Sequence, residues 1–229
     1  MEWPKLLEYI DPKTDEVILD LACGTGELSV KLASYGCKIY GIDRSNNSIN
    51  LAKKFAAKEQ MSCDFQVGDA ESLPYPSDFF DKIVSSCSLE HFDDDVTALK
   101  EMNRVLKLNG YVILSVDSFT YPISNELKEI HRKKFYVVNY YSLESLKEKL
   151  ISNNFELIKS DYLIRSALST FVYNYLIIKS GLSRSPIRDM RYLITLVAYP
   201  FCFISDKYLG ISDKGYTLLV KSQKSSNKG

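Results

Sequence analysis

Neither sign of charge predominates in this sequence, because 29 Lys and Arg residues balance 29 Asp and Glu residues over 229 positions. Proteins that bind nucleic acid through its phosphates carry a basic excess, so the composition predicts no nucleic-acid partner. The five cysteines are odd in number and include no C-x-x-C pair. This usage is typical of reduced thiols in a cytoplasmic protein rather than of a disulfide-stabilised secreted one.

Long hydrophobic runs are also absent. The first residues, Met1–Lys5, do not lead into an apolar segment, so no signal peptide is predicted. Two apolar runs near the C-terminus, Ala167–Ile178 and Tyr192–Ile204, are shorter than the roughly 18 uninterrupted apolar residues that cross a membrane, and Pro200 interrupts the second. We therefore expect a cytoplasmic chain without a membrane-spanning helix.

A glycine turn between a strand and a helix is the strongest local feature. Val17–Leu21 is a short apolar run of the kind that forms a strand buried on both faces of a parallel sheet. Gly24 and Gly26 follow, and a helical pattern then runs from Glu27 to Tyr35. Glycine lets a ligand approach the backbone closely, and the start of a helix offers unpaired N–H groups. The simplest alternative is a tight turn with no ligand.

Acidic residues lie at the predicted ends of neighbouring strands. Ile39–Asp43 is a second short strand, and its last residue lies where a doubly wound fold binds the two hydroxyls of a ribose. Asp69 directly follows a third strand, Cys63–Val67, although an Asx turn at a strand end is the alternative role for that residue. Together with the glycine turn, these positions predict a cofactor that contains adenosine.

Four segments occur in the order and at the spacing of a known family. Leu19–Gly26, which reads LDLACGTG, resembles the first motif of class I S-adenosylmethionine-dependent methyltransferases, and Gly41–Asp43 resembles the second. Gly68–Pro74 and Phe79–Val84 are similar to the third and fourth. The resemblance is greatest to the small-molecule type 11 group, which includes the quinone- and sterol-biosynthesis methyltransferases.

The resemblance implies that the cofactor is S-adenosyl-L-methionine and that the product is S-adenosyl-L-homocysteine. In the family, the carboxylate at the position of Asp69 accepts a hydrogen bond from the adenine amino group, and the backbone N–H at the position of Ala70 faces the ring. The sulfonium donor carries a good leaving group, so the protein mainly aligns the nucleophile, and no catalytic triad is required. The cofactor residues that we expect are Asp20, Ala22, Cys23, Gly24, Gly26, Asp43, Arg44, Asp69, Ala70 and Cys87.

His91 follows the fourth predicted strand, Phe80–Cys87, at the edge of the sheet where ligands of such folds bind. A histidine there can act as a general base near neutral pH if the acceptor atom is an oxygen. The alternatives are that His91 only shapes its loop or contacts the methionine end of the cofactor. We also expect Glu90, Tyr140 and Tyr141 on the acceptor side.

The chain departs from a metal-binding pattern of related enzymes. Some quinone and RNA methyltransferases hold a divalent metal with an E-x-x-E-H motif at this position. In this chain Cys87 replaces the first Glu of the motif, while Glu90 and His91 are retained. The ligand set is incomplete, so we predict no metal.

These patterns predict an α/β fold, namely a Rossmann-like, doubly wound, seven-stranded and mostly parallel sheet with an antiparallel last strand. The helix before the fifth strand is expected to end at Asn109–Gly110. Phe155–Ile164 and Gly215–Lys221 are the predicted sixth and seventh strands. About fifty residues lie between these two strands, where relatives usually have a tight hairpin.

We expect one domain over residues 1–221, a helical insertion at 165–211, and a disordered tail at 222–229. The insertion is rich in Tyr, Phe, Leu and Ile, and its basic residues include Lys179, Arg184, Arg188 and Arg191. A helical pair packed on the edge of the sheet is one explanation. An apolar lid or a peripheral membrane contact is the other.

The predicted function is in-line methyl transfer from S-adenosylmethionine to a small acceptor that is apolar or lipid-linked. Two functions of other classes compete with it. A non-catalytic S-adenosylmethionine-binding scaffold would share the same cofactor residues. An NAD(P)-binding oxidoreductase would also have the strand, glycine turn and helix, but the third glycine of its motif would fall at Ser29, and no segment resembles a separate catalytic domain.

Overall fold

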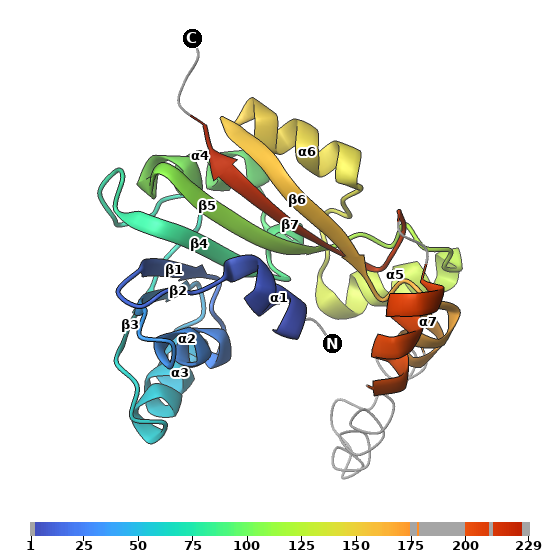
Figure 1. Cartoon of the computed structure of the whole chain (residues 1–229), viewed down its shortest axis with the longest axis horizontal. Helices are drawn as coiled ribbons and strands as arrows, with labels where there is room; N and C mark the ends of the chain where they lie inside the picture. The colour runs from blue at the N-terminus through green and yellow to red at the C-terminus, as the bar shows by residue number, and fades with distance from the viewer. Residues whose placement is uncertain (1–2, 175–177, 179–199, 211–212, 226–229) are drawn as a thin grey trace.

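The computed structural model describes residues 3–174, 178, 200–210 and 213–225. These residues form one seven-stranded sheet with helices on both faces (Figure 1). The strands are β1 (Val17–Leu21), β2 (Lys38–Asp43), β3 (Cys63–Val67), β4 (Phe80–Ser86), β5 (Leu106–Asp117), β6 (Phe155–Leu163) and β7 (Thr217–Lys224). The helices are α1 (Trp3–Ile10), α2 (Glu27–Ala33), α3 (Asn46–Lys58), the short 3-10 helix η1 (Leu89–His91), α4 (Asp95–Val105), α5 (Asn125–Phe135), α6 (Leu143–Ser152) and α7 (Ala167–Tyr173).

The strand order is β3-β2-β1-β4-β5-β7-β6. The pairs from β3 to β5 are parallel, and β7 runs antiparallel to both β5 and β6. This topology confirms the predicted doubly wound sheet with an antiparallel last strand. The order reverses between β1 and β4, and such a switch point leaves a crevice beyond the carboxyl ends of the two strands.

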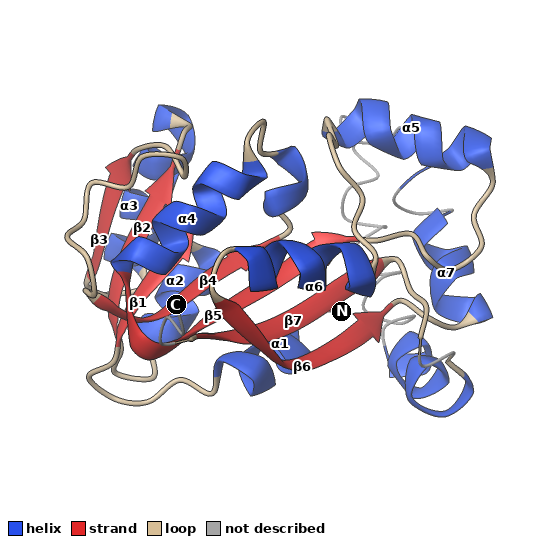
Figure 2. Cartoon of the chain, turned by 90° about the horizontal axis from the view of Figure 1, so that it is seen from above, coloured by secondary structure: helices blue, strands red, loops and turns tan. Residues whose placement is uncertain are grey.

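Two layers of helices bury the two faces of the sheet. Helices α4 and α6 cover one face, and α1 and α2 cover the other (Figures 1 and 2). Met102 and Leu146 are fully buried in the core of the first face, and Ile10 and Leu32 in that of the second. Burial of apolar surface on both faces stabilises the sheet and holds the crevice in place.

Serine side chains begin several helices as the sequence predicts. The Ser45 hydroxyl accepts a hydrogen bond of 3.2 Å from the backbone N–H of Ser48 at the start of α3. Ser142 and Ser145 exchange two such bonds at the start of α6 and form a capping box. These caps satisfy N–H groups that the first helical turn leaves unpaired.

The predicted end of the helix before β5 is wrong. Helix α4 ends at Val105, and β5 begins at Leu106, which pairs with Phe80 of β4. The register shifts after this pair, and Asn109 lies within β5 with a φ of 65°. The expected Asn109–Gly110 helix stop is therefore an irregularity inside the strand.

The predicted start of the disordered tail is also wrong. Strand β7 begins at Thr217 and continues to Lys224, which lies within the segment that was expected to be a tail. The Lys224 ammonium lies 2.8 Å from the Asp78 carboxylate and donates to the Leu106 carbonyl at 2.7 Å. Pairing with β6 and this ion pair keep the strand in the sheet. Residues 226–229 lie outside the described part of the chain.

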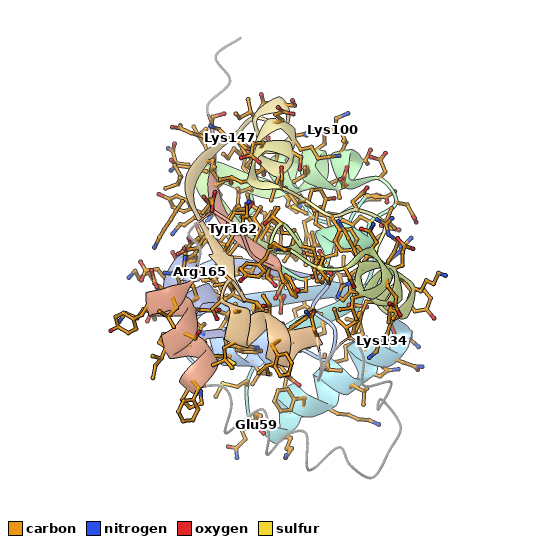
Figure 3. All side chains as sticks on the ribbon, turned by 90° about the vertical axis from the view of Figure 1, so that its right-hand side faces the viewer. Glu59, Lys100, Lys134, Lys147, Tyr162 and Arg165 are labelled. Atoms are coloured by element: carbon orange, nitrogen blue, oxygen red, sulfur yellow. The ribbon has the colours of Figure 1, made fainter. Side chains whose placement is uncertain are left out.

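The described parts of the insertion are helical, in α7 and in residues 200–209. The carboxylate of Asp206 accepts hydrogen bonds from the backbone N–H groups of Arg165 and Ser166, at 3.2 and 3.0 Å. Figure 3 shows Arg165 beside this second helix, and its side chain donates to the Asp206 carbonyl. The basic residues Lys179, Arg184, Arg188 and Arg191 lie outside the described residues. Within the described residues, no helix is long and apolar enough to cross a membrane.

Candidate active site

The glycine turn after β1 has an unusual backbone. Ala22, Gly24 and Gly26 have φ values of 58°, 53° and 79°, in the left-handed region that residues other than glycine rarely adopt. The Cys23 N–H donates to the Ile42 carbonyl at 3.0 Å. The turn is thus bonded to the end of β2.

The two glycines of the turn differ in what surrounds them. A Cβ at Gly26 would lie 2.9 Å from side-chain atoms of Ala52 and Phe65, so this glycine allows the turn to pack closely against α3 and β3. A Cβ at Gly24 would meet no atom within 4 Å. The backbone at Gly24 therefore borders open space, as a ligand cradle requires.

Asp20 lies behind the turn rather than in the pocket. It is 2% exposed and accepts a hydrogen bond of 2.5 Å from the Ser29 hydroxyl of α2. Burial raises the pKa of Asp20 to about 6, although the bonds from Ser29 oppose that shift. Asp20 therefore connects β1 to the first turn of α2 and does not belong to the pocket lining. Burial also raises the pKa of the neighbouring Cys23 thiol well above its usual range.

A pocket opens at the switch point between β1 and β4. Its lining consists of Leu21, Ala22, Ile42, Asp43, Arg44, Gly68, Asp69, Ala70, Glu71, Ser88, His91 and Phe92. It brings together six residues proposed from the sequence, namely Ala22, Asp43, Arg44, Asp69, Ala70 and His91. The other six lining residues were not proposed as site residues. Leu21, Ile42, Gly68 and Glu71 lie within the motif segments, whereas Ser88 and Phe92 belong to the loop around His91.

The two strand-end carboxylates are held by backbone N–H groups. Asp43 accepts from Gly24 at 2.9 Å with one oxygen and from Ser45 at 2.8 Å with the other. Asp69 accepts from the Glu71 N–H at 3.0 Å, the Asx turn expected for a strand end. Asp69 also lines the pocket, so the turn and a ligand role are compatible.

Arg44 lies at the mouth of the pocket between two acidic residues. Its guanidinium nitrogens are 3.6 Å from Asp69 and 3.9 Å from Asp93. All three side chains are substantially exposed, so these long ion pairs contribute little to stability. They nevertheless place a positive charge next to the carboxylate proposed to bind the adenine amino group.

His91 ends η1 at the rim of the same pocket. Its Nδ1 atom lies 3.3 Å from the carbonyl oxygen of Tyr136, at the end of α5. The ring is half-buried and belongs to the pocket lining. His91 is therefore the one imidazole among the residues that line the pocket.

Glu90 and Tyr141 lie in the core behind the pocket. Glu90 is fully buried and accepts a hydrogen bond from the Asp117 N–H at 3.3 Å. The Tyr141 hydroxyl is also buried and donates to Asp95 at 2.5 Å. Burial and that carboxylate raise the pKa of Tyr141 far above its usual range. Neither residue belongs to the pocket lining.

Tyr140 belongs to a buried aromatic cluster with the other histidine of the chain. Its hydroxyl lies 3.1 Å from Nδ1 of His131, which is 2% exposed. Burial raises the pKa of Tyr140 to about 12 and lowers that of His131 to about 4. The ring of Phe119 packs edge-on against both. His131 was not singled out from the sequence, because no motif surrounds it.

Cys87 follows β4 with a φ of 49° and an exposed side chain. Its N–H donates to the Ser115 carbonyl at 2.9 Å, and its sulfur lies 3.6 Å from the Ser115 hydroxyl. It does not belong to the pocket lining. Over the described residues, no three His, Cys, Asp or Glu side chains are grouped so that they could hold a metal ion.

A switch-point pocket with a glycine turn and two strand-end carboxylates defines a Rossmann-like protein of the adenosine-binding class. Residues 19–114 match the family described as "Methyltransferase domain". This match agrees with the resemblance of the motifs to class I S-adenosylmethionine-dependent methyltransferases of the type 11 group.

Curated relatives are similar over about half of the chain. Demethylmenaquinone methyltransferase of Lactococcus lactis is 34% identical over 135 residues, which cover 56% of this chain and 53% of that protein. Ubiquinone biosynthesis O-methyltransferase of Coxiella burnetii is 32% identical over 115 residues, 49% of each protein. The chain spans about half the length of these curated relatives.

The solved structure of YcgJ from Bacillus subtilis has the same fold. It matches 98% of this chain and 98% of its own, with a TM-score of 0.68 and 21% sequence identity. The Rossmann-like architecture therefore extends beyond the segment that carries the motifs.

Proposed function

We propose that this protein is an S-adenosylmethionine-dependent methyltransferase and that its acceptor is a small molecule, apolar or lipid-linked. The observation that carries the proposal is the pocket at the switch point, whose lining joins Asp43 and Asp69 to His91. The residues proposed to bind the cofactor and the candidate base thus line one cavity. The family match over residues 19–114 supports the same function.

The residues of the turn fit an adenosine cofactor. Gly24 offers an open approach to the backbone, and Ala22 and Gly24 both have the left-handed conformation. Each oxygen of Asp43 accepts one backbone N–H and keeps a lone pair that can accept a ribose hydroxyl. When bound, S-adenosylmethionine supplies an activated methyl group on a sulfonium.

The remaining residues of the pocket align the reactants. Asp69 is proposed to accept the adenine amino group, while its other oxygen keeps the Asx turn. His91 is proposed to take the proton of an oxygen acceptor. Burial of Glu90 and Tyr141 behind the loop keeps the His91 backbone in place. This positioning supplies most of what an in-line displacement requires.

The helix at residues 200–209 supports an apolar acceptor. Its buried residues include the small side chains Cys202 and Ser205. Its exposed side chains are mostly large and apolar: Phe201, Phe203, Ile204, Tyr208 and Leu209 are each at least 50% exposed. A surface helix in water normally has the opposite arrangement, with its apolar side buried. This helix therefore favours contact with another apolar surface.

We propose that this apolar surface contacts a lipid bilayer. Leu168 and Phe171 of α7 are 43% and 67% exposed and extend the apolar surface of the insertion. The exposed Lys207 on the second helix could pair with an anionic headgroup. The two curated relatives are named for quinone biosynthesis. A peripheral contact would bring a lipid-linked acceptor to the pocket.

Binding and turnover test the proposal separately. Calorimetry with S-adenosylhomocysteine should show one saturable site that NAD does not occupy. Transfer of a radiolabelled methyl group from S-adenosylmethionine to a short-chain prenylated hydroquinone should be measurable. Binding of NAD instead would favour an oxidoreductase. Binding of S-adenosylhomocysteine without transfer to hydroquinones or phenols would favour the scaffold.

A further inference from the structure

The ring of His91 is held by a group that can only accept a hydrogen bond. Its Nδ1 atom lies 3.3 Å from the main-chain carbonyl oxygen of Tyr136. A carbonyl has no proton to give, so Nδ1 must carry the proton of that bond. In a neutral imidazole only one nitrogen is protonated, and Nε2 is then left with its lone pair.

The carbonyl that makes this contact belongs to a turn fixed to the residue before His91. The N–H groups of Val138 and Asn139 both donate to the Glu90 carbonyl, at 2.8 and 3.1 Å. Tyr136 caps the end of α5 with a φ of 56°, and its N–H donates to the Arg132 carbonyl. These bonds fix the Tyr136 carbonyl relative to the backbone of His91.

We infer that the Tyr136–Asn139 turn is a positioning element for His91, which it holds in the tautomer that leaves Nε2 as the basic nitrogen. The inference rests on the proposed function, because the proton that Nε2 takes comes from the acceptor. It names the acceptor class as a hydroxyl compound, such as a phenol or an enol. An acceptor that attacks without losing a proton would gain nothing from this arrangement.

The step balances with these groups. The acceptor oxygen forms a bond to the methyl carbon as the bond between that carbon and the sulfonium sulfur breaks. The hydroxyl proton passes to Nε2 of His91, and the sulfur leaves as a neutral thioether. The imidazolium then releases a proton to solvent, which its half-buried ring can reach. The Tyr136 carbonyl accepts from Nδ1 throughout and also stabilises the charged ring.

The tautomer can be measured directly, because the chain has only two histidines. We would label the full-length protein with [15N]histidine and record its spectrum at about pH 8, above the usual histidine pKa. The difference from a His91→Gln variant assigns the His91 signals. We expect Nδ1 of His91 to be of the protonated type and Nε2 of the unprotonated type. The opposite tautomer, or an averaged pair, overturns the inference.

Two substitutions at one exposed position test the role of the carbonyl. The Tyr136 side chain is 83% exposed, so Tyr136→Gly removes little packing and keeps the positive φ. Tyr136→Pro cannot keep that φ and loses the N–H bond. We expect the glycine variant to keep the tautomer, because it keeps the carbonyl and the positive φ. The proline variant should mix the tautomers and lower kcat on the order of tenfold, without changing cofactor affinity.

The outcomes separate this inference from the proposed function. The 15N spectrum requires neither cofactor nor acceptor. Absence of methyl transfer would therefore overturn the proposed function, while the tautomer of His91 could still be measured. Equal rates and equal tautomers in the glycine and proline variants would overturn the positioning role. If the proline variant does not fold, the wild-type spectrum alone decides the inference.

Discussion

The carboxylate of Asp43 accepts a hydrogen bond of 2.9 Å from the backbone N–H of Gly24. This bond joins the end of β2 to the turn that follows β1, and a second bond from Ser45 fixes the other oxygen. The side chain proposed to bind the ribose therefore also orders the turn that approaches the cofactor. Binding and local order should change together when Asp43 is replaced.

We expect Asp43→Ala to weaken S-adenosylhomocysteine binding by about 1–3 kcal/mol, because the ribose loses its acceptor. Asp43→Asn is the matched control, since its carbonyl oxygen keeps one backbone bond and only one ribose contact is altered. Calorimetry gives the affinities, and urea unfolding separates the effect on stability. Unchanged affinity in the alanine variant would show that Asp43 does not bind the ribose.

The two glycines of the turn should respond differently to the same change. Gly24→Ala puts a Cβ into open space, so its main costs are about 1–2 kcal/mol of backbone strain and a loss of cofactor affinity. Gly26→Ala adds the same strain, and its Cβ also clashes with Ala52 and Phe65, so it should unfold at a lower urea concentration. Calorimetry and urea unfolding of both variants give the comparison. Equal stabilities would contradict the close packing at Gly26.

We expect His91→Ala to lower kcat roughly a hundredfold or more on a hydroxyl acceptor, because the general base is lost. Cofactor affinity should stay the same, because the cofactor contacts proposed above come from other residues. Steady-state kinetics with calorimetry on the same sample make the distinction. Parallel losses in rate and binding would instead place His91 against the cofactor, and no loss in either would make it a residue of the loop alone.

The exposed apolar residues of the insertion give a test of membrane contact. Phe201→Ser combined with Leu209→Ser should reduce co-sedimentation with anionic liposomes severalfold, because both side chains lie more than 60% exposed on the second helix. Leu51→Ser is the control, since Leu51 is 53% exposed on α3, away from the insertion. If the wild type stays in the supernatant with liposomes, the membrane proposal fails.

Local sequence patterns were sufficient for the parts of the fold that local chemistry decides. The run Val17–Leu21 followed by glycines is a strand and turn in the structure, and Ser45 caps a helix as expected. The end of α4 was missed, because Leu106 is held by Phe80 of a strand far away in sequence. Likewise, Lys224 stays in β7 through an ion pair with Asp78. Such long-range contacts have no local signal.

The candidate site shows the same limit. Asp43 and Asp69 were proposed because their positions at strand ends are visible in the sequence, and both line the pocket. The sequence could not indicate that Tyr141 faces Asp95 in the core, because a tyrosine just before a helix can lie in the core or beside the pocket. His131 was missed for a related reason. Its partner Tyr140 is near in sequence, but Tyr173, whose hydroxyl lies 3.3 Å from the other ring nitrogen of His131, is 42 residues away.

Two buried titratable groups, Asp20 and His131, should make the stability of the protein depend on pH in opposite directions. The pKa of Asp20 is raised to about 6, so the folded chain keeps a proton that the unfolded chain has lost. Its contribution to stability is therefore present near pH 4 and falls as the pH rises to 6. The pKa of His131 is lowered to about 4, so the unfolded chain takes up a proton first as the pH falls. Its contribution is present above about pH 6.5 and is lost toward pH 4.

Substitutions of Asp20 and of His131 should therefore change the pH dependence of stability in opposite directions. Asp20→Asn keeps an acceptor for Ser29 but cannot titrate, so its stability relative to wild type should rise by on the order of 2 kcal/mol between pH 4 and 6. Between pH 6.5 and 4 the free energy of unfolding of His131→Gln should fall by on the order of 2 kcal/mol less than that of wild type, because the variant lacks the titrating ring. Urea unfolding of the three proteins at half-unit pH steps provides the curves. Parallel curves would mean that neither group has a shifted pKa in the folded chain. A steeper acid loss for His131→Gln than for wild type would reverse the assigned direction for that ring.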